Sequence, residues 1–419
     1  MRIQTAVCVV LFVGFLAAVA VQTMFQRLPE SFLYGVFKPI EEPALSLESW
    51  WDGRFQRQVQ GTEQTEGWID RRVGFRSAWI KTDGQINFSL FREIPTTANP
   101  QQIFLGKDNW LYEKDHIDNY LGLDAVPVGQ FQQFAADLRS LQDELEQREI
   151  TMLLVISPSK ATHYPEYLPD WIVRERHMLR RHDTDRKSNY EVLRPLLDQE
   201  GVHYVDAVQR FREEREKQRQ ARQEYRLFPR GGTHWSHYGA SLVVAEMLER
   251  LKELTGKDLL QLRCEAPSVD CQTTGTDNDL GDMLSIWTPW VTKGPTPHPH
   301  LLGTPGTWSP DVLWVGDSFS NALTELMDKY QVYRRRDMLF MFLRKTTYPG
   351  QKTYPVDKAK FDWQQELSRR DVVIIEINEA QLSDLAHGFV QGALVFLRGQ
   401  TPDQGSGIRG QGPGIRGQG

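Results

Sequence analysis

A serine and a histidine each stand where a predicted strand or loop gives way to a helix, and together they could carry nucleophilic chemistry. Ser318 follows residues 312–315, an apolar run typical of a buried strand, and the turn 316–318 leads into a helix. His234 precedes a second helix that opens at Ser236. A serine hydroxyl needs a base to be a good nucleophile. We therefore predict Ser318 as nucleophile and His234 as its general base.

Further polar residues lie near these positions or at the end of another strand. Asn378 ends the strong apolar run 372–377, where its amide could donate to an oxyanion or cap the strand end. Asp317 is predicted to brace the turn, and Ser320 is the alternative nucleophile. Lys160 follows another predicted strand and could contact an anionic sugar or be exposed. A strand followed by an Asp/Ser helix cap, without catalysis, is the structural alternative.

Several motifs, taken in order, resemble the SGNH-hydrolase-like domain of the alginate O-acetyltransferase family (AlgJ and AlgX type). The strongest are Gly232-Thr233-His234-Trp235 with Tyr238-Gly239-Ala240, and Gly316-Asp317-Ser318-Phe319-Ser320. Weaker segments accompany them, namely Gly106-Lys107-Asp108-Asn109-Trp110-Leu111, Pro158-Ser159-Lys160 with Tyr164-Pro165-Glu166, and Glu376-Ile377-Asn378-Glu379.

The resemblance implies acetyl transfer from a donor ester to hydroxyls of an extracytoplasmic polysaccharide, through an acyl-Ser318 intermediate. It also implies a membrane-bound O-acyltransferase as the partner that supplies acetyl groups. Two other functions stay open: a carbohydrate esterase with the same machinery, in which water is the acceptor, and a polysaccharide-binding or assembly component without catalysis.

Gly232 departs from the pattern of this family, which has an aspartate two residues before the histidine. That aspartate orients the imidazole, and loss of the equivalent charge in a serine protease lowers turnover about 10⁴-fold. A backbone carbonyl or an acid from residues 276–282 would have to substitute. We predict Asp277 or Asp279, although each could also be a turn or cap residue.

Strands alternate with helices along most of the chain, which predicts an α/β fold with a mostly parallel sheet flanked by helices. A hairpin is expected around residues 103–112. Further strands are expected at 151–157, 203–205, 312–315, 339–343 and 372–377. Residues 101–400 would form this domain, with a loop-rich insertion at 257–309, and 26–100 a stalk packed on it. The Gly-rich tail 401–419 should be disordered.

The N-terminus predicts export. Residues 6–21 are an apolar run behind Arg2, so residues 1–25 are a signal-anchor or a cleaved signal peptide. We expect the body on the periplasmic side of a bacterial inner membrane, anchored by one span or released if the signal is cleaved. Cys264 and Cys271 could form a disulfide in that compartment or stay unpaired.

Composition and cysteine spacing exclude several classes of ligand. The 419 residues are 40% hydrophobic, enough for a sizeable core, and the net charge of −6 gives no reason to expect nucleic acid. Because no second Cys or His pair stands at ligand spacing beside the cysteines, we expect no metal, and we expect no cofactor.

Overall fold

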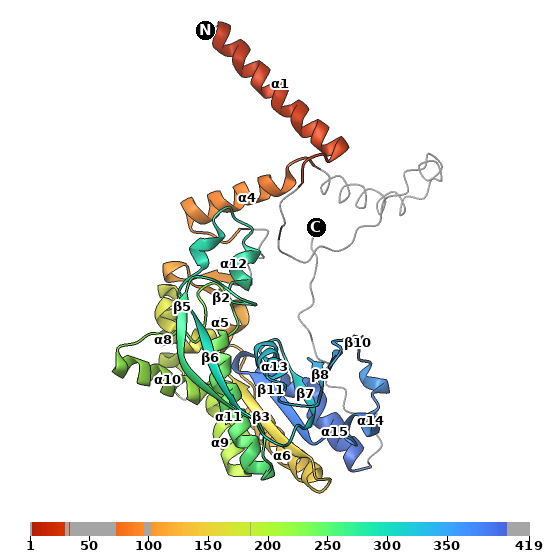
Figure 1. The fold of residues 1–419 in the computed structure, drawn as a ribbon. Coiled ribbons are helices and arrows are strands. Elements are labelled where there is room, and N and C mark those ends of the chain that lie inside the picture. Colours follow the sequence, from red (N-terminus) through yellow and green to blue (C-terminus); the bar gives the residue numbers. More distant parts are fainter. Residues whose placement is uncertain (1, 30–32, 34–72, 96–101, 185, 400–419) are drawn as a thin grey trace, which may run out of the picture.

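The computed structural model describes residues 2–29, 33, 73–95, 102–184 and 186–399. Helix α1 (Arg2–Phe25) projects away from the body (Figure 1). Among the described residues it is the one helix long and apolar enough to cross a membrane, over Gln4–Phe25. Most of the predicted stalk and the whole predicted tail lie outside the described residues.

A seven-stranded sheet forms the centre of the body, in the spatial order β10-β9-β8-β7-β11-β3-β4. Its strands are β3 (Thr151–Ser157), β4 (Tyr204–Asp206), β7 (Asp311–Gly316), β8 (Arg335–Phe340), β9 (Arg344–Tyr348), β10 (Thr353–Pro355) and β11 (Val372–Asn378). The strands from β8 to β4 are parallel, and β9 and β10 add an antiparallel edge. The predicted fold class is confirmed.

One predicted strand is displaced. Residues 339–343 were expected to be extended, but β8 ends at Phe340 because Met341 and Phe342 both adopt positive φ, 48° and 52°. That backbone turns the chain back into β9.

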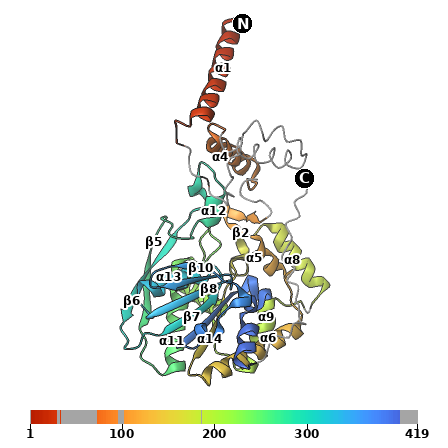
Figure 2. The same ribbon diagram turned by 90° about the vertical axis from the view of Figure 1, so that its right-hand side faces the viewer.

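Helices cover both faces of the sheet (Figure 2). Alternate residues of β7 point to opposite sides: Val312 and Trp314 belong to one core cluster, Leu313 and Val315 to the other. The first cluster is completed by α5 (Lys114–Leu121), α8 (Asp170–His182), α10 (Ala207–Ala221), α11 (His237–Thr255) and α13 (Ser320–Lys329). The second is completed by α6 (Val128–Glu146), α9 (Asn189–Glu200), α14 (Trp363–Leu367) and α15 (Phe389–Leu397).

Short turns and caps connect these elements. Helix α9 begins with a capping box between Ser188 and Glu191 and ends at Gly201, whose φ is 69°. The remaining short helices are η3 (Lys107–Asn109), α7 (Lys160–His163), η4 (Pro165–Tyr167), η6 (Lys358–Lys360) and η7 (Glu379–Gly388).

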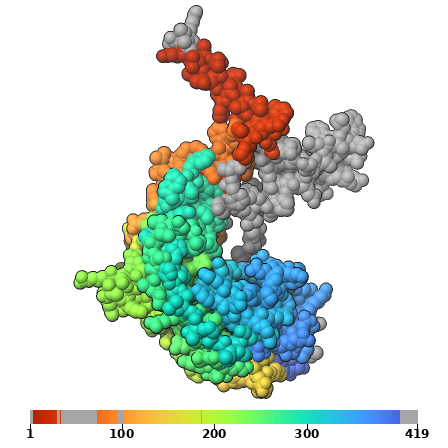
Figure 3. Space-filling view, in the orientation of Figure 1, coloured from red at the N-terminus to blue at the C-terminus, as the bar shows by residue number. Residues whose placement is uncertain are grey.

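A smaller cap lies between α1 and the sheet. It contains α4 (Arg76–Ile86), the π-helical turn η1 (Asn87–Phe91), the antiparallel pair β1 (Ile103–Leu105) and β2 (Leu111–Glu113), α12 (Asp279–Met283) and η5 (Pro289–Thr292). A separate apolar cluster holds these elements together, formed by Phe88, Ile103, Leu111, Leu280, Leu284 and Ile286. Figure 3 shows α4 in orange between α1 and the rest of the molecule.

The insertion at 257–309 is more regular than predicted. It contains a long antiparallel pair, β5 (Gln261–Asp270) and β6 (Thr296–Thr304), as well as α12 and η5. Of the two alternatives left open for the cysteines, the structure has the unpaired one, because Cys264 and Cys271 are both free. Cys264 lies on β5 and Cys271 just beyond it, so extended backbone separates them by roughly 20 Å, too far for a disulfide.

Candidate active site

The predicted nucleophile lies in the turn between β7 and α13. Ser318 is half-buried, whereas Asp317 and Phe319 on either side of it are buried. The carboxylate of Asp317 accepts hydrogen bonds from the backbone N–H of Phe319 at 2.7 Å and from that of Asn378 at 3.1 Å. Asp317 therefore braces the turn, as predicted, and ties it to the end of β11.

Ser320 does not have the surroundings of a nucleophile. Its fully buried hydroxyl donates to Glu376 Oε2 at 2.7 Å and accepts from Trp314 Nε1 at 2.9 Å. A Cβ at Gly316 would lie 2.2 Å from Ser320 Oγ, so this close approach requires the glycine. Ser320 therefore stabilises the turn from the buried side.

Glu376 is a buried acid that sequence reasoning left without a role. Its carboxylate accepts from Ser157 Oγ at 2.5 Å and from the Asp317 N–H at 3.2 Å, in addition to Ser320. Burial raises the pKa of Glu376. Burial and the nearby Glu376 carboxylate raise the pKa of Asp317 well above its usual value. The two buried carboxylates repel each other, so each disfavours the charged form of the other.

His234 contacts Asp279, one of the two acids predicted to orient it. His234 Nδ1 lies 2.7 Å from Asp279 Oδ2, and Asp279 Oδ1 accepts from the Thr233 N–H at 2.9 Å. Burial is the largest influence on His234 and opposes its charge, but Asp279, helped by Asp317 and Glu113, outweighs it and raises the pKa of His234. The imidazolium form is therefore stabilised in the site.

Asp277 does not share this position. Its carboxylate accepts from the Thr274 N–H at 2.8 Å and the Thr274 hydroxyl at 3.1 Å, so Asp277 is a turn residue and its prediction as the orienting acid is not supported.

Gly232 allows the loop that carries Asp279 to approach the histidine. A Cβ on Gly232 would lie 2.5 Å from the Thr276 carbonyl oxygen and 3.0 Å from the carbonyl carbon of Asp277. An aspartate at position 232 would therefore collide with this backbone. The absence of a side chain at position 232 is thus what leaves room for the loop whose Asp279 contacts His234.

Lys160 is neither exposed nor directed at a ligand, in contrast to both alternatives in the sequence analysis. It is 0% exposed, and its ammonium donates to three carbonyl oxygens: Leu111 at 2.7 Å, Arg230 at 2.9 Å and Gly232 at 2.6 Å. Burial lowers the pKa of Lys160 well below its ordinary value, although the nearby Asp279 opposes that shift. Lys160 holds the backbone that leads to His234.

Asn378 caps the strand end instead of facing an oxyanion. Its amide nitrogen donates to Ser157 Oγ at 3.2 Å and to the Pro158 carbonyl at 3.1 Å, and its side-chain oxygen accepts from the Ala380 N–H. The residue is 1% exposed. Because both amide hydrogens have partners inside the protein, the predicted oxyanion role is not supported.

Phe319 brings the nucleophile turn and the histidine loop together. Its ring centroid lies 5.0 Å from that of His234 and 5.8 Å from that of His116. His116 is a second buried histidine that sequence reasoning missed, and its Nδ1 accepts from the Lys160 N–H at 3.2 Å. Burial lowers the pKa of His116 to about 3, so it is neutral. No periodicity or spacing around His116 marks it in the sequence.

One ring nitrogen of His234 is available as a proton acceptor. Within the described part of the chain, its Nε2 is buried without a hydrogen-bond partner. Nδ1 is bound to Asp279, so Nε2 is the atom that could exchange a proton with a hydroxyl in the adjoining turn. Ser318 is the half-buried residue of that turn, and no hydrogen bond joins it to His234 in the described part of the chain. Catalytic hydrogen bonds commonly form only when substrate binds.

The chain matches one protein-family model and two curated relatives. The family model described as "SGNH hydrolase-like domain, acetyltransferase AlgX" matches residues 103–337, more than half of the chain. A probable alginate O-acetylase AlgJ from Pseudomonas aeruginosa is 28% identical over 169 residues, which are 40% of this chain and 36% of that relative. The corresponding protein of Pseudomonas syringae pv. tomato is 26% identical over 166 residues, 39% of this chain and 35% of its own length.

Among solved structures, the O-acetyltransferase domain of Pseudomonas putida AlgJ matches 68% of this chain and 92% of that domain, with 19% identity and a TM-score of 0.38. The chain aligns with only about a third of the length of the two curated relatives. The family model, which spans both His234 and Ser318, decides the assignment: the chain belongs to the family of AlgX-type SGNH hydrolase-like domains.

Proposed function

We propose that this protein is a serine-dependent O-acetyltransferase that acetylates hydroxyls of an extracytoplasmic polysaccharide. The observation that carries the proposal is the 2.7 Å contact between Asp279 and His234, beside the turn that presents Ser318. This contact supplies the acid–imidazole pair that Gly232 removes from the local sequence. Family membership and the similarity to probable alginate O-acetylases support acetyl as the group and a polymer such as alginate as the acceptor.

The proposed reaction has two half-reactions. Ser318 Oγ attacks the carbonyl carbon of an acetyl ester while His234 Nε2 takes the hydroxyl proton. The intermediate collapses, the donor alcohol leaves with the proton from His234, and acetyl-Ser318 remains. A sugar hydroxyl then attacks acetyl-Ser318, His234 accepts its proton, and the proton returns to Ser318 Oγ as the acetylated sugar leaves.

The location that suits this reaction is the outer side of a bacterial inner membrane, with α1 retained as an anchor. A membrane-bound O-acyltransferase would bring acetyl groups across that membrane. The apolar α1 supports the anchor, and the similarity to alginate O-acetylases supports the setting.

The test is to incubate the full chain with an acetyl-ester donor, with and without oligosaccharide, and to follow acetylated sugar, free acetate and the mass of the Ser318 peptide. We expect an acetylated Ser318 peptide and transfer to sugar, both absent in Ser318→Ala. Ser320→Ala is the matched control, which should lose stability but keep the acetyl-enzyme.

Acetate release that oligosaccharide does not change would instead indicate an esterase. No acetyl-enzyme and no turnover, with polysaccharide binding retained, would indicate a non-catalytic binding component and would overturn the proposal.

A further inference from the structure

Helix α4 shows the reverse of the usual pattern for a surface helix. The buried residues of α4 and η1 are the small Ser77 and Gly84, followed by Phe88, and Gly84 and Phe88 face the body. The residues on the opposite side are large and apolar: Trp79 is 45% exposed, Ile86 46% and Leu90 73%. Positions two residues apart lie about 200° apart around a helix, so these are opposite faces. A soluble helix would direct its apolar stripe inward.

The apolar surface continues beyond α4. Phe91, Trp287 and Trp290 are 63%, 45% and 64% exposed. The loop after α12 is fixed to α4 by hydrogen bonds from Trp287 Nε1 to Thr82 Oγ1 at 3.1 Å and from the Thr288 N–H to Gln85 Oε1 at 3.0 Å. We call the six residues Trp79, Ile86, Leu90, Phe91, Trp287 and Trp290 the apolar ridge.

A second link closes the ridge at its other end. Asn109 accepts from Arg92 at 2.7 Å and donates to the Val291 carbonyl at 3.1 Å. These partners directly follow Phe91 and Trp290, so two segments far apart in sequence form one surface. A contiguous exposed apolar surface of this kind marks an interaction site.

The ridge is continuous with the predicted membrane anchor. Trp79 packs edge-on against Phe15 of α1, with ring centroids 5.5 Å apart. The Gly74 N–H donates to Thr23 Oγ1 at 2.9 Å, and a Cβ on Gly74 would lie 2.6 Å from the Val19 carbonyl oxygen. The start of α4 therefore packs on the second half of the one candidate membrane span among the described residues.

The chemistry of the ridge fits the boundary between lipid and water. Three of its six residues are tryptophans, which concentrate at membrane interfaces, and Lys81 Nζ lies 5.5 Å above the Trp287 ring. Asp83 interrupts the stripe and accepts a hydrogen bond from Asn87 at 3.2 Å, as expected of a helix that keeps one polar edge toward water. Because Phe15 lies midway along Gln4–Phe25, the Trp79 end of the stripe reaches the hydrocarbon layer.

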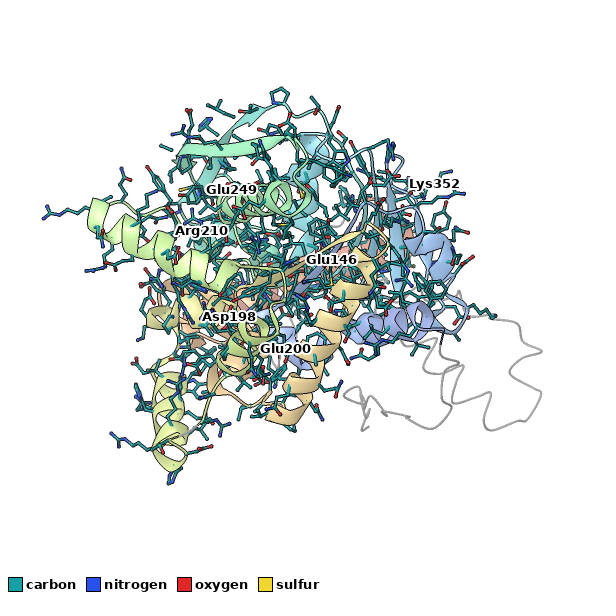
Figure 4. All side chains as sticks on the ribbon, turned by 90° about the horizontal axis from the view of Figure 1, so that it is seen from below. Glu146, Asp198, Glu200, Arg210, Glu249 and Lys352 are labelled. Atoms are coloured by element: carbon teal, nitrogen blue, oxygen red, sulfur yellow. The ribbon has the colours of Figure 1, made fainter. Side chains whose placement is uncertain are left out.

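Helix α4 lies at the end of the body nearer α1 (Figure 1). Figure 4 views the body from the opposite end, where charged side chains such as Glu146, Asp198 and Glu249 project from the helices.

We propose that the apolar ridge is a second membrane-contact surface, which rests on the outer leaflet beside α1 and holds the body in a fixed orientation. The inference depends on α1 being the retained anchor of the proposed function. It has a consequence for the site: α12 begins at Asp279 and packs through Leu280 and Leu284 on Phe88, so the acid that orients His234 belongs to the cap that meets the lipid.

The test places spin labels on the full chain reconstituted in bilayers of phosphatidylethanolamine and phosphatidylglycerol, with the two downstream cysteines changed to serine. Accessibility to oxygen, which concentrates in lipid, is compared with accessibility to a water-soluble nickel complex. Leu90→Cys and Trp290→Cys probe the ridge. Leu302→Cys on β6 and Trp171→Cys on α8 are matched controls, because both residues are exposed but lie outside the ridge. The native Cys8 is changed to serine in these four variants and kept alone in a fifth.

We expect the ridge labels to gain oxygen accessibility and lose nickel accessibility relative to both controls. Ridge labels as accessible to nickel as the controls, with the Cys8 label in lipid, would overturn the inference while leaving the anchor intact. A Cys8 label in water would refute the anchor and the inference with it. Acetyl-ester turnover, measured on the same samples before labelling, reports the proposed chemistry separately.

Discussion

The two halves of the site are built in different ways. The nucleophile half, from the end of β7 to the start of α13, rests on buried carboxyl groups: Asp317 bonds to its own turn and to β11, and Glu376 lies beneath both. The histidine half rests on a buried ammonium, since Lys160 binds three backbone carbonyls. Its acid comes from Asp279, 45 residues further along the chain.

The difference lies in what each half takes from distant segments. The nucleophile half has its strand, turn and helix in one continuous segment and takes its bracing groups from the end of β11, 56 and 61 residues further along the chain. The histidine half exists only when the 276–282 loop packs on the glycines before His234, so its integrity depends on tertiary contacts. The histidine half therefore depends on a distant segment for the acid itself, whereas the nucleophile half depends on one for its bracing.

The largest expected effect is that of removing the distant acid. Asp279→Asn should lower kcat by up to about 10⁴-fold, because the imidazole loses its orientation and the charge that stabilises its protonated form. The acid limb of the pH–rate profile should also move to lower pH, since burial alone lowers the pKa of His234 once the carboxylate is gone.

Asp277→Asn is the matched control for Asp279→Asn and should leave both kcat and the acid limb unchanged, because Asp277 bonds to Thr274. If both variants behaved alike, the assignment of Asp279 as the orienting acid would be refuted.

A smaller effect is expected from restoring the aspartate that the family has before the histidine. Gly232→Asp should lower kcat, because its side chain displaces the backbone at Thr276 and Asp277 and draws Asp279 away from His234. It should also fail to rescue Asp279→Asn. Gly129→Asp on α6 is the control, since a Cβ there meets no atom within 4 Å. Recovery of near wild-type turnover in the double variant would contradict this packing argument.

The smallest effect concerns Glu379, the buried acid that directly follows β11. Burial raises the pKa of Glu379 to about 7 from 4.5, and its carboxylate accepts from the Ser159 N–H at 2.9 Å. The folded state thus holds a proton that the unfolded chain has released between these pH values. Its contribution to the free energy of unfolding falls as pH rises, by about 3 kcal/mol from pH 4.5 to 7.

Glu379→Gln should remove this slope, which denaturant titrations at several pH values would measure. The exposed Glu249→Gln should keep it. An unchanged slope in Glu379→Gln would show that Glu379 is ionised in the folded protein.

The sequence was sufficient for the features that depend on local pattern. The strands around Val312 and Val372, the alternation with helices and the positions of Ser318 and His234 all follow from periodicity and turn residues. Asp279 could be narrowed to one loop but not separated from Asp277, because only packing decides which carboxylate reaches the imidazole.

The errors have the same physical origin. Lys160 and Asn378 were assigned outward roles because polar residues at strand ends commonly face a ligand. Both are buried, and both donate to backbone carbonyls, Lys160 at the glycine loop and Asn378 at the end of β3. The sequence does not reveal which buried backbone groups need a side-chain partner, because that depends on how the loops pack.

The contact between Gly232 and the Asp279 loop also matters for classifying related sequences by motif. A motif filter that demands Asp-x-His would sort this chain among inactive paralogues, because it looks for the acid at one fixed offset. A carboxylate does contact the histidine, but it comes from Asp279 in a different loop, which can approach because position 232 is a glycine. Chains with glycine before the histidine and an acid in the equivalent of residues 276–282 should be examined as a separate class before they are dismissed as degenerate.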